Sequence, residues 1–306
     1  MPFRFGAVVG PFVALAAVAA AAVVPGPPAV DEAYRAEVRK WRAQREERLR
    51  ADGGWLTVAG LFWLEEGRKT FGSDGASDFV LPASAPAKAG AFERTGASVR
   101  VLLEPGVAAQ LDGRPLAGAA PMAPDTSGRP DVLAMGSLTM TVIERSGRYG
   151  IRLRDRDNPA RKAFTGLSWF DVDEGWRIDA RFVPYPEPKM VKVPNVLGQV
   201  NEMPSPGSVE FTRDGQAIRL DGVLEEKDAD ELFFIVRDGT SGNETYGAGR
   251  FLYAPLPKDG RIVLDFNKAY SPPCAFTPYA TCPLPPPQNR IPVRVEAGEK
   301  TYGHGH

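Results

Sequence analysis

Residues that could bind or transform a ligand gather in the last third of the chain. Between positions 238 and 289, acids, amides, hydroxyls and arginine alternate with strand-forming residues and prolines. The side chains predicted to contact a ligand are Asp238, Thr245, Tyr246, Arg250, Asp265, Asn267, Tyr270 and Asn289. Arg250 could hold a carboxylate or phosphate in a bidentate fork while the others add hydrogen bonds. The same residues could instead form a buried ion-pair network that fixes strand register, and the pattern leaves both interpretations open.

The two cysteines of the chain lie in the same segment. Cys274 and Cys282 are close in sequence, and the loop between them is rich in proline. In a protein exported to an oxidising compartment, an isolated pair of cysteines predicts a disulfide. The alternative is a pair of free thiols, which could bind a metal or act as a nucleophile.

The composition excludes several chemistries. The chain has 2 histidines, His304 and His306, and both lie in a short polar tail. A Ser-His-Asp triad, a Cys-His pair and a histidine-rich metal site therefore have no credible histidine. There is no glycine-rich phosphate loop, and the acidic runs 155–158 and 171–175 lack the spacing of a calcium-binding EF-hand. We therefore predict no metal and no cofactor.

The charge balance limits the partners. Lys and Arg number 37, Asp and Glu number 38, and the net charge is −1. Such a chain has no long-range field to attract nucleic acid, so no nucleic-acid partner is predicted. The partner that fits the polar cluster is a small anionic or amphipathic molecule.

The first 24 residues have the composition of an export signal. Arg4 is the only charged side chain there, and Gly6–Val24 is an unbroken apolar run with small residues near its end. This pattern predicts a cleaved signal peptide over residues 1–24, or an uncleaved membrane anchor. The protein is expected to be secreted, periplasmic or in the cell envelope, with a membrane as partner only if the segment stays uncleaved.

One helix is expected before the polar cluster. Residues 25–53 are predicted to form a linker and an amphipathic helix from Asp31 to Asp52, capped by Asp31 and stopped by Gly53 and Gly54. Its apolar stripe consists of Tyr34, Val38, Trp41 and Leu49. The opposite face carries both signs of charge, which is typical of a helix that docks on a domain.

Strands are expected after this helix. From Trp55 onward, short runs alternate apolar and polar residues between turn residues. Asp112-Gly113, Asp214-Gly215 and Asp259-Gly260 are predicted hairpin turns. The fold class is therefore all-β, with the N-terminal helix followed by two β-sandwich or β-barrel regions. The first region covers 54–154 and the larger second region covers 155–300, followed by a tail over 301–306.

The chain also carries family-like motifs on both sides of the region boundary. They are Gly54-Trp55-Leu56, Gly60–Leu64, Phe71-Gly72-Ser73, Glu144-Arg145, Arg152, Asp155, Phe164, Gly166, Trp176, Arg177 and the polar set from 238 to 289. In these motifs the chain closely resembles the bacterial and archaeal family called domain of unknown function 1684, over nearly all of its length after residue 50. That resemblance implies no activity, substrate or catalytic residue.

A second, weaker resemblance concerns the first β region alone. This region resembles the forkhead-associated sandwich in Leu64, Gly67, Phe71-Gly72-Ser73, Asp78–Pro82, Gly96 and Leu111–Leu116. That family binds phosphothreonine through an arginine, a serine and a buried histidine, and here the histidine and the Arg-Ser pattern are absent. The resemblance implies a fold and no phosphopeptide binding.

Three functions of different classes fit these observations. The first is an exported β protein that binds a small ligand in an arginine-centred polar pocket. The second is a hydrolase that works with carboxylates alone, for which Glu144, Asp155, Asp238 and Asp265 are the candidates. The third is a structural or envelope-associated protein that interacts with another chain.

Overall fold

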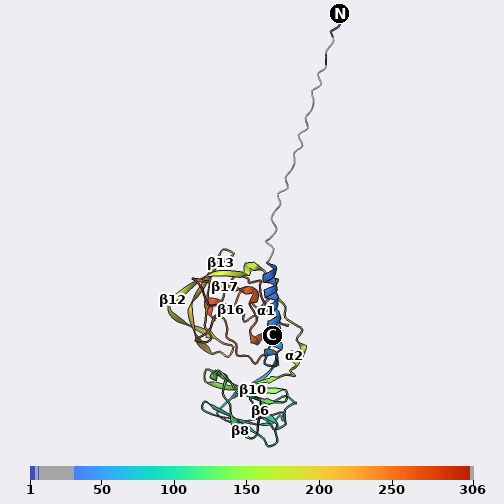
Figure 1. Cartoon of the computed structure of the whole chain (residues 1–306), viewed down its shortest axis with the longest axis vertical. Helices are drawn as coiled ribbons and strands as arrows, with labels where there is room; N and C mark the ends of the chain where they lie inside the picture. Colours follow the sequence, from blue (N-terminus) through green and yellow to red (C-terminus); the bar gives the residue numbers. More distant parts are fainter. Residues whose placement is uncertain (4–5, 7–30, 304–306) are drawn as a thin grey trace.

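The computed structural model describes residues 1–3, 6 and 31–303 (Figure 1). Most of the predicted signal or anchor segment, and both tail histidines, lie outside the described residues. Within the described part of the chain, no helix is long and apolar enough to cross a membrane. The fold is all-β, with one long N-terminal helix and several sheets, as the sequence predicted.

Helix α1 spans Glu32–Arg50 and packs along the second β region (Figure 1). Asp31 caps it, because its side chain accepts a hydrogen bond of 3.0 Å from the backbone of Ala33. The predicted stripe faces the protein, with Tyr34, Val38 and Leu49 buried. A second, short helix, α2, spans Pro159–Ala163 at the junction of the two regions.

The first β region contains two sheets. One has the order β1-β11-β10-β9-β6-β7 and the other the order β3-β2-β4-β5-β8. The strands are β1 Val58–Leu64, β2 Gly67–Gly72, β3 Phe79–Val80, β4 Gly90–Thr95, β5 Ser98–Leu103, β6 Ala109–Leu111, β7 Arg114–Leu116, β8 Ala119–Pro121, β9 Val132–Met135, β10 Leu138–Arg145 and β11 Arg148–Asp155.

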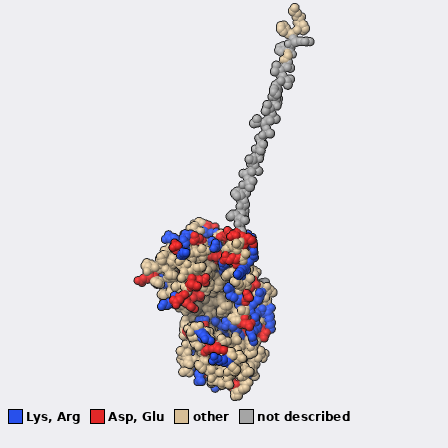
Figure 2. All heavy atoms as spheres, in the orientation of Figure 1, with Lys and Arg blue, Asp and Glu red and all other residues tan. Residues whose placement is uncertain are grey.

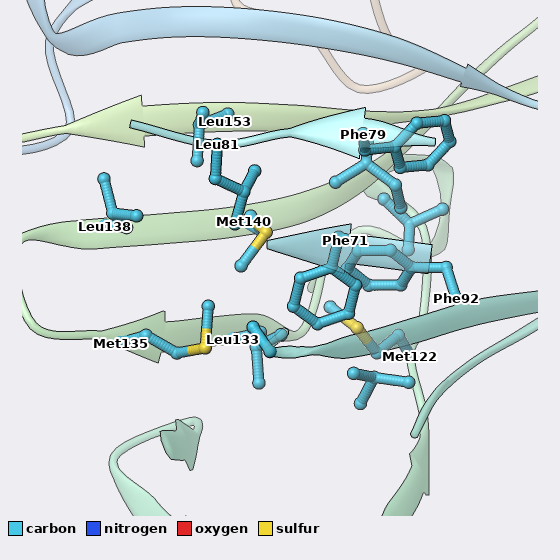
Figure 3. Close-up of a cluster of buried hydrophobic side chains, with 14 of the residues drawn as sticks. Phe71, Phe79, Leu81, Phe92, Met122, Leu133, Met135, Leu138, Met140 and Leu153 are labelled. Atoms are coloured by element: carbon cyan, nitrogen blue, oxygen red, sulfur yellow. The ribbon is translucent and has the colours of Figure 1, made fainter. Parts of the chain in front are cut away.

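The core of this region lies between its two sheets (Figure 3). Phe71 on β2 and Phe92 on β4 stack at 4.6 Å and face Met140 and Leu153 of the other sheet. Because side chains alternate along a strand, the neighbours of Leu153, Arg152 and Arg154, point to the opposite face of β11. That face is turned toward the second β region.

The second β region contains a four-stranded sheet, β14-β13-β12-β17, and the pair β15-β16. Its strands are β12 Arg177–Pro194, β13 Val200–Arg213, β14 Gln216–Gly222, β15 Glu231–Val236, β16 Arg250–Pro255 and β17 Arg261–Asp265. Val209, Leu220 and Leu264 from the larger sheet enclose a core with Leu232 and Phe234 of β15.

Tight turns join the strands where the sequence predicted hairpins. Asp112, Asp214 and Asp259 adopt positive φ angles of 50°, 50° and 52°, and the glycine that follows each of them also has a positive φ angle. Two of these turns connect paired strands, β6 to β7 and β13 to β14. The predicted Asp-Gly hairpins at these two places are confirmed.

The two regions touch through the turns at their facing ends. Ser146, between β10 and β11, donates a hydrogen bond of 3.1 Å to the side chain of Asn201 on β13. The side chain of Gln199 donates one of 3.2 Å to the carbonyl of Arg145. These contacts close one side of a cavity between the regions.

Candidate functional site

Arg250, the centre of the predicted pocket, lies in a closed network at the start of β16. Its side chain is 2% exposed, and Nη2 donates to Asp238 Oδ2 at 3.0 Å and to the carbonyl of Val295 at 2.9 Å. Nη1 donates to the carbonyl of Ala297. Burial lowers the pKa of Arg250, and the Asp238 carboxylate opposes that shift. This pair holds the C-terminal segment against β16.

Asp238 is satisfied within the protein in the same way. Its Oδ1 accepts hydrogen bonds from the amide and hydroxyl of Thr240, at 2.8 and 2.6 Å, and from the amide of Val295 at 3.1 Å. Thr245 extends the network through a 2.9 Å contact between the two threonine hydroxyls. The cavity beside Arg250 measures about 10 Å³, which leaves no room for a ligand. Arg250, Asp238 and Thr245 therefore fit the alternative interpretation, in which buried polar groups fix the strand register.

Two predicted amides also bind backbone. Asn289 accepts from the amide of Asp221 at 2.8 Å and donates to its carbonyl at 2.9 Å. Asn267 donates to the carbonyl of Asp173 at 2.7 Å and to the Tyr34 hydroxyl at 3.0 Å. Both asparagines are buried, and each fixes a segment that lacks regular pairing.

Asp265 and Tyr270 lie elsewhere, in a groove of about 650 Å³ between α1 and strands β16 and β17. Asp265 accepts a hydrogen bond of 2.6 Å from Tyr34 of α1 and pairs with Lys268 at 3.3 Å. Tyr270 lies under the guanidinium of Arg45, 4.6 Å from the ring centre. The groove carries both signs of charge, and most of its charged groups already have a partner.

Tyr246 is the last of the predicted ligand residues. Its hydroxyl donates a hydrogen bond of 3.2 Å to the carbonyl of Cys274, and burial raises the pKa of this phenol. The structure therefore separates the predicted set into the Arg250 network, two backbone-binding amides, the groove under α1 and the cysteine loop. It does not bring the eight residues into one cavity.

Cys274 and Cys282 are free thiols in the structure, without the bond that the sequence predicted. The backbone amide of Cys274 donates to the sulfur of Cys282 at 3.2 Å, so this sulfur lies against its neighbour's main chain. The hydrogen bond between the two thiols lowers the pKa of Cys274 and, with burial, raises that of Cys282. The two side chains are adjacent but unbonded.

A cavity of about 340 Å³ lies between the two β regions, and we call it the arginine cleft. Its lining residues are Trp55, Arg145, Arg152, Asn201, Met203, Glu225, Phe233, Phe251, Pro273, Thr281, Cys282 and Pro283. One wall is cationic and comes from the first region. The opposite wall is mainly apolar and comes from β13, β15, β16 and the cysteine loop.

Arg152 on β11 is the central residue of the cationic wall. Its side chain is 6% exposed, and its guanidinium lies 5.1 Å from the ring centre of Trp55. Among the described residues, neither its Nε nor its Nη2 has a hydrogen-bond acceptor. Burial, followed by the charges of Arg145 and Arg154, lowers the pKa of Arg152 to about 10. The group therefore stays cationic at neutral pH.

Arg145 at the end of β10 is held differently. It pairs with Asp125 at 2.8 Å and donates to the hydroxyl of Thr281 at 3.1 Å, which bridges the two regions. Asp125 is the one carboxylate among the groups that shift the pKa of Arg152, and it already serves Arg145. The cationic wall thus has more positive than negative charge.

The arginine cleft was not predicted as a site, although three of its residues stand in motifs already noted. Trp55, Arg145 and Arg152 all belong to the motifs that carry the family resemblance. The usable signal was the pair Arg152 and Arg154 at alternate positions of a strand, on the face away from the core. Two arginines on one strand face, with no acid between them, indicate an anion site more strongly than one arginine among acids.

Charged side chains of both signs are mixed on the visible face of the molecule. On the face shown in Figure 2, basic and acidic side chains occur on both regions, and neither sign covers the face. Among the described residues, no group of three or more His, Cys, Asp or Glu side chains is arranged to hold a metal ion.

Comparison with solved structures gives two similar proteins. An uncharacterized protein of Haloarcula marismortui, solved by NMR, is 33% identical, with 46% of this chain and 79% of that protein covered and a TM-score of 0.40. The FHA domain of FhaA, solved with the intracellular domain of Rv3910, is 16% identical, with 31% and 97% covered and a TM-score of 0.22. No curated protein matches.

A family model matches residues 162–300, which include the second β region and the cysteine loop. Its description assigns no activity to its members. The Arg250 network, the cysteine loop and the apolar wall of the arginine cleft all fall inside this segment. Through residues 162–300, the chain belongs to the family described as protein of unknown function (DUF1684).

Proposed function

We propose that the protein binds a small anionic, amphipathic molecule in the arginine cleft. The observation that carries this proposal is the buried Arg152 guanidinium, whose Nε and Nη2 have no acceptor among the described residues. Burying an unpaired charge costs several kcal/mol, on the order of the whole stability margin of a domain. A ligand that supplies the missing acceptor would recover much of that cost.

The shape of the guanidinium specifies the kind of acceptor. Nε and Nη2 lie on one edge of the planar group, and that edge matches the two oxygens of a carboxylate or phosphate. Thr281 and Asn201 line the same cavity and offer a hydroxyl and an amide for further hydrogen bonds. The ligand's anionic end would therefore lie against Arg152.

The opposite wall specifies the rest of the ligand. Met203, Phe233 and Phe251 present apolar surface, and a volume of about 340 Å³ fits a small organic molecule. Glu225 lies on this side and accepts a hydrogen bond of 2.5 Å from Tyr253. A second negative charge on the ligand would meet this carboxylate. A monoanion with a short apolar tail fits the cleft better than a dianion.

The carboxylate-hydrolase alternative has less support. Asp238 pairs with Arg250 in the core, Asp265 lies in the groove under α1, and Asp155 accepts a hydrogen bond in the turn after β11. Glu144 accepts from the backbone amide of Gly147. An acid and base pair must converge on one bond, and these four carboxylates lie in four different settings.

Export and the disulfide remain proposals that rest on the sequence pattern. The basic start and apolar run of residues 1–24 support a cleaved signal, and an oxidising compartment would favour a bond between Cys274 and Cys282. Expression in a bacterial host, followed by cell fractionation and N-terminal mass spectrometry, tests this. A full-length chain recovered from the cytoplasm would contradict it.

The binding proposal is tested by calorimetric titration with three probes: octanoate, acetate and inorganic phosphate. We expect octanoate to bind more tightly than acetate, because only its tail reaches the apolar wall, and more tightly than phosphate. Arg152→Met should abolish octanoate binding. Arg100→Met is the matched control, because Arg100 is an exposed arginine on β5. Equal responses of the two variants, or no binding of octanoate to the wild type, would overturn the proposal.

A further inference from the structure

One of the two cysteines, Cys282, lies in the wall of the arginine cleft, and the other, Cys274, lies beside it outside the lining. Cys282 is 4% exposed and lines the cavity, and Pro273, Thr281 and Pro283 from the same loop line it as well. Cys274 is more exposed than its partner. Its amide lies 3.2 Å from the Cys282 sulfur, so the two residues already meet across the ends of the loop.

We propose that Cys274 and Cys282 are a thiol–disulfide exchange pair, and that oxidation of this pair tightens anion binding in the arginine cleft. The second half of the proposal rests on the proposed function. The first half stands on the two thiols themselves and needs no ligand.

The exposures and hydrogen bonds of the two thiols assign their roles. Cys274 is the attacking thiol, because it is accessible and its hydrogen bond from Cys282 lowers its pKa. Cys282 is the resolving thiol, because it is buried against Cys274. The co-reactant is a low-molecular-weight disulfide such as oxidised glutathione.

The reaction proceeds in two exchanges. The thiolate of Cys274, after losing its proton to solvent, attacks one sulfur of the small disulfide, and one small thiolate leaves. The sulfur of Cys282, also deprotonated, then attacks the sulfur of Cys274 in the mixed disulfide, and the second small thiolate leaves. The protein loses two protons and two electrons, and the small disulfide gains them to give two thiols.

The loop is anchored so that this change remains local. The Tyr246 hydroxyl holds the carbonyl of Cys274 at 3.2 Å, and the amide of Val196 donates to the carbonyl of Cys282 at 3.0 Å. With both main-chain ends fixed, bond formation moves the two sulfurs toward each other and draws the Cys282 side chain within the cleft wall. Four lining residues of the cleft lie at the ends of the closed loop.

A closed loop loses less freedom when a ligand binds. The wall formed by Thr281, Cys282 and the flanking prolines would already be ordered in the oxidised protein. We therefore expect oxidation to tighten octanoate binding by roughly fivefold.

The test starts with the thiols and needs no ligand. The purified protein is equilibrated in a series of reduced and oxidised glutathione, quenched with an alkylating reagent and weighed by intact-mass spectrometry. We expect the protein to convert reversibly between a reduced form with two alkylated thiols and an oxidised form with no alkylated thiol. A peptide map of the oxidised form should link Cys274 to Cys282. Thiols that stay free across the whole series would overturn the exchange pair, whatever the protein binds.

Calorimetry with octanoate on both redox forms then tests the coupling. The wild type should bind more tightly when oxidised, whereas Cys274→Ser and Cys282→Ala should bind equally in both buffers. Circular dichroism shows whether each variant is folded. If one variant does not fold, the other one serves as the control. Equal affinity of the two wild-type forms overturns the coupling. If the thiols interconvert but octanoate binds to neither form, the proposed function and the coupling are both wrong. The exchange pair is still supported in that case.

Discussion

Replacing Arg152 and Arg250 by methionine should change the stability of the protein in opposite directions. Both side chains are almost fully buried, at 6% and 2% exposure, and both lie on strands. Arg250 has Asp238 and three main-chain carbonyls as partners, whereas Nε and Nη2 of Arg152 have none among the described residues. Methionine fills a similar volume without a charge, so the comparison isolates the pairing.

The magnitude for Arg152 follows from its pKa. A decrease from 12.5 to about 10 means that the fold disfavours the charged form by about 3 kcal/mol. Methionine removes that cost but also removes the contact with the Trp55 ring, which contributes about 1 kcal/mol. Arg152→Met should therefore stabilise the ligand-free protein by about 2 kcal/mol, or raise Tm by roughly 4–8 °C.

The magnitude for Arg250 comes from the group it leaves behind. Arg250→Met would strand the Asp238 carboxylate, whose side chain is as buried as its partner. Removing one member of a buried pair costs about 3–5 kcal/mol. With the same relation between stability and Tm, Arg250→Met should lower Tm by roughly 6–20 °C.

Differential scanning calorimetry at neutral pH measures both changes on ligand-free protein. Octanoate added in excess should raise the Tm of the wild type and leave that of Arg152→Met unchanged, because binding to the folded state alone stabilises it. A lower Tm for Arg152→Met would refute the reasoning. It would mean that the guanidinium is stabilised within the fold and needs no ligand.

Three further predictions concern the frame around the site. Burial raises the pKa of Glu299, so the fold disfavours its ionised form. The wild type should therefore lose stability relative to Glu299→Gln as pH rises above 4.5, until the pKa of Glu299 in the folded protein is passed. Urea denaturation over a pH series measures this difference. Tyr34→Phe removes the 2.6 Å hydrogen bond to Asp265 and should cost about 1–3 kcal/mol by chemical denaturation, with no change in octanoate affinity. Gly249→Ala should cost about 1–3 kcal/mol in the same assay, because φ is +97° and a Cβ would lie 2.5 Å from the carbonyl oxygen of Val236.

The parts of the fold that depend on neighbouring residues could be predicted from the sequence. The helix predicted from Asp31 to Asp52 spans Glu32–Arg50, because its cap and its apolar stripe are local signals. The Asp-Gly turns at 112 and 214 were predicted for the same reason. Strand order could not be predicted: β1 pairs with β11, and no period-two pattern specifies a partner so far along the chain.

The candidate site was predicted less well, because a site depends on what the fold brings together. The polar cluster was treated as one unit since its members are near in sequence. The structure divides it, because its members lie on different elements: Arg250 begins β16, Asp265 ends β17, and Asn289 lies in a separate turn. Residues 152 and 282 meet at the arginine cleft although they lie in different regions, and nothing local to either position indicates this.

The two arginines show why a residue type alone did not identify the site. For Arg250 the fold supplies a carboxylate from twelve residues away, and the guanidinium becomes part of the core. For Arg152 the fold supplies more arginine and an aromatic ring, and two buried nitrogens are left with no acceptor among the described residues. A chain that needed only stability would gain from an apolar side chain at this position. The proposed ligand would account for the charge at position 152, and the cleft around it has a volume of about 340 Å³ and an apolar wall for such a molecule.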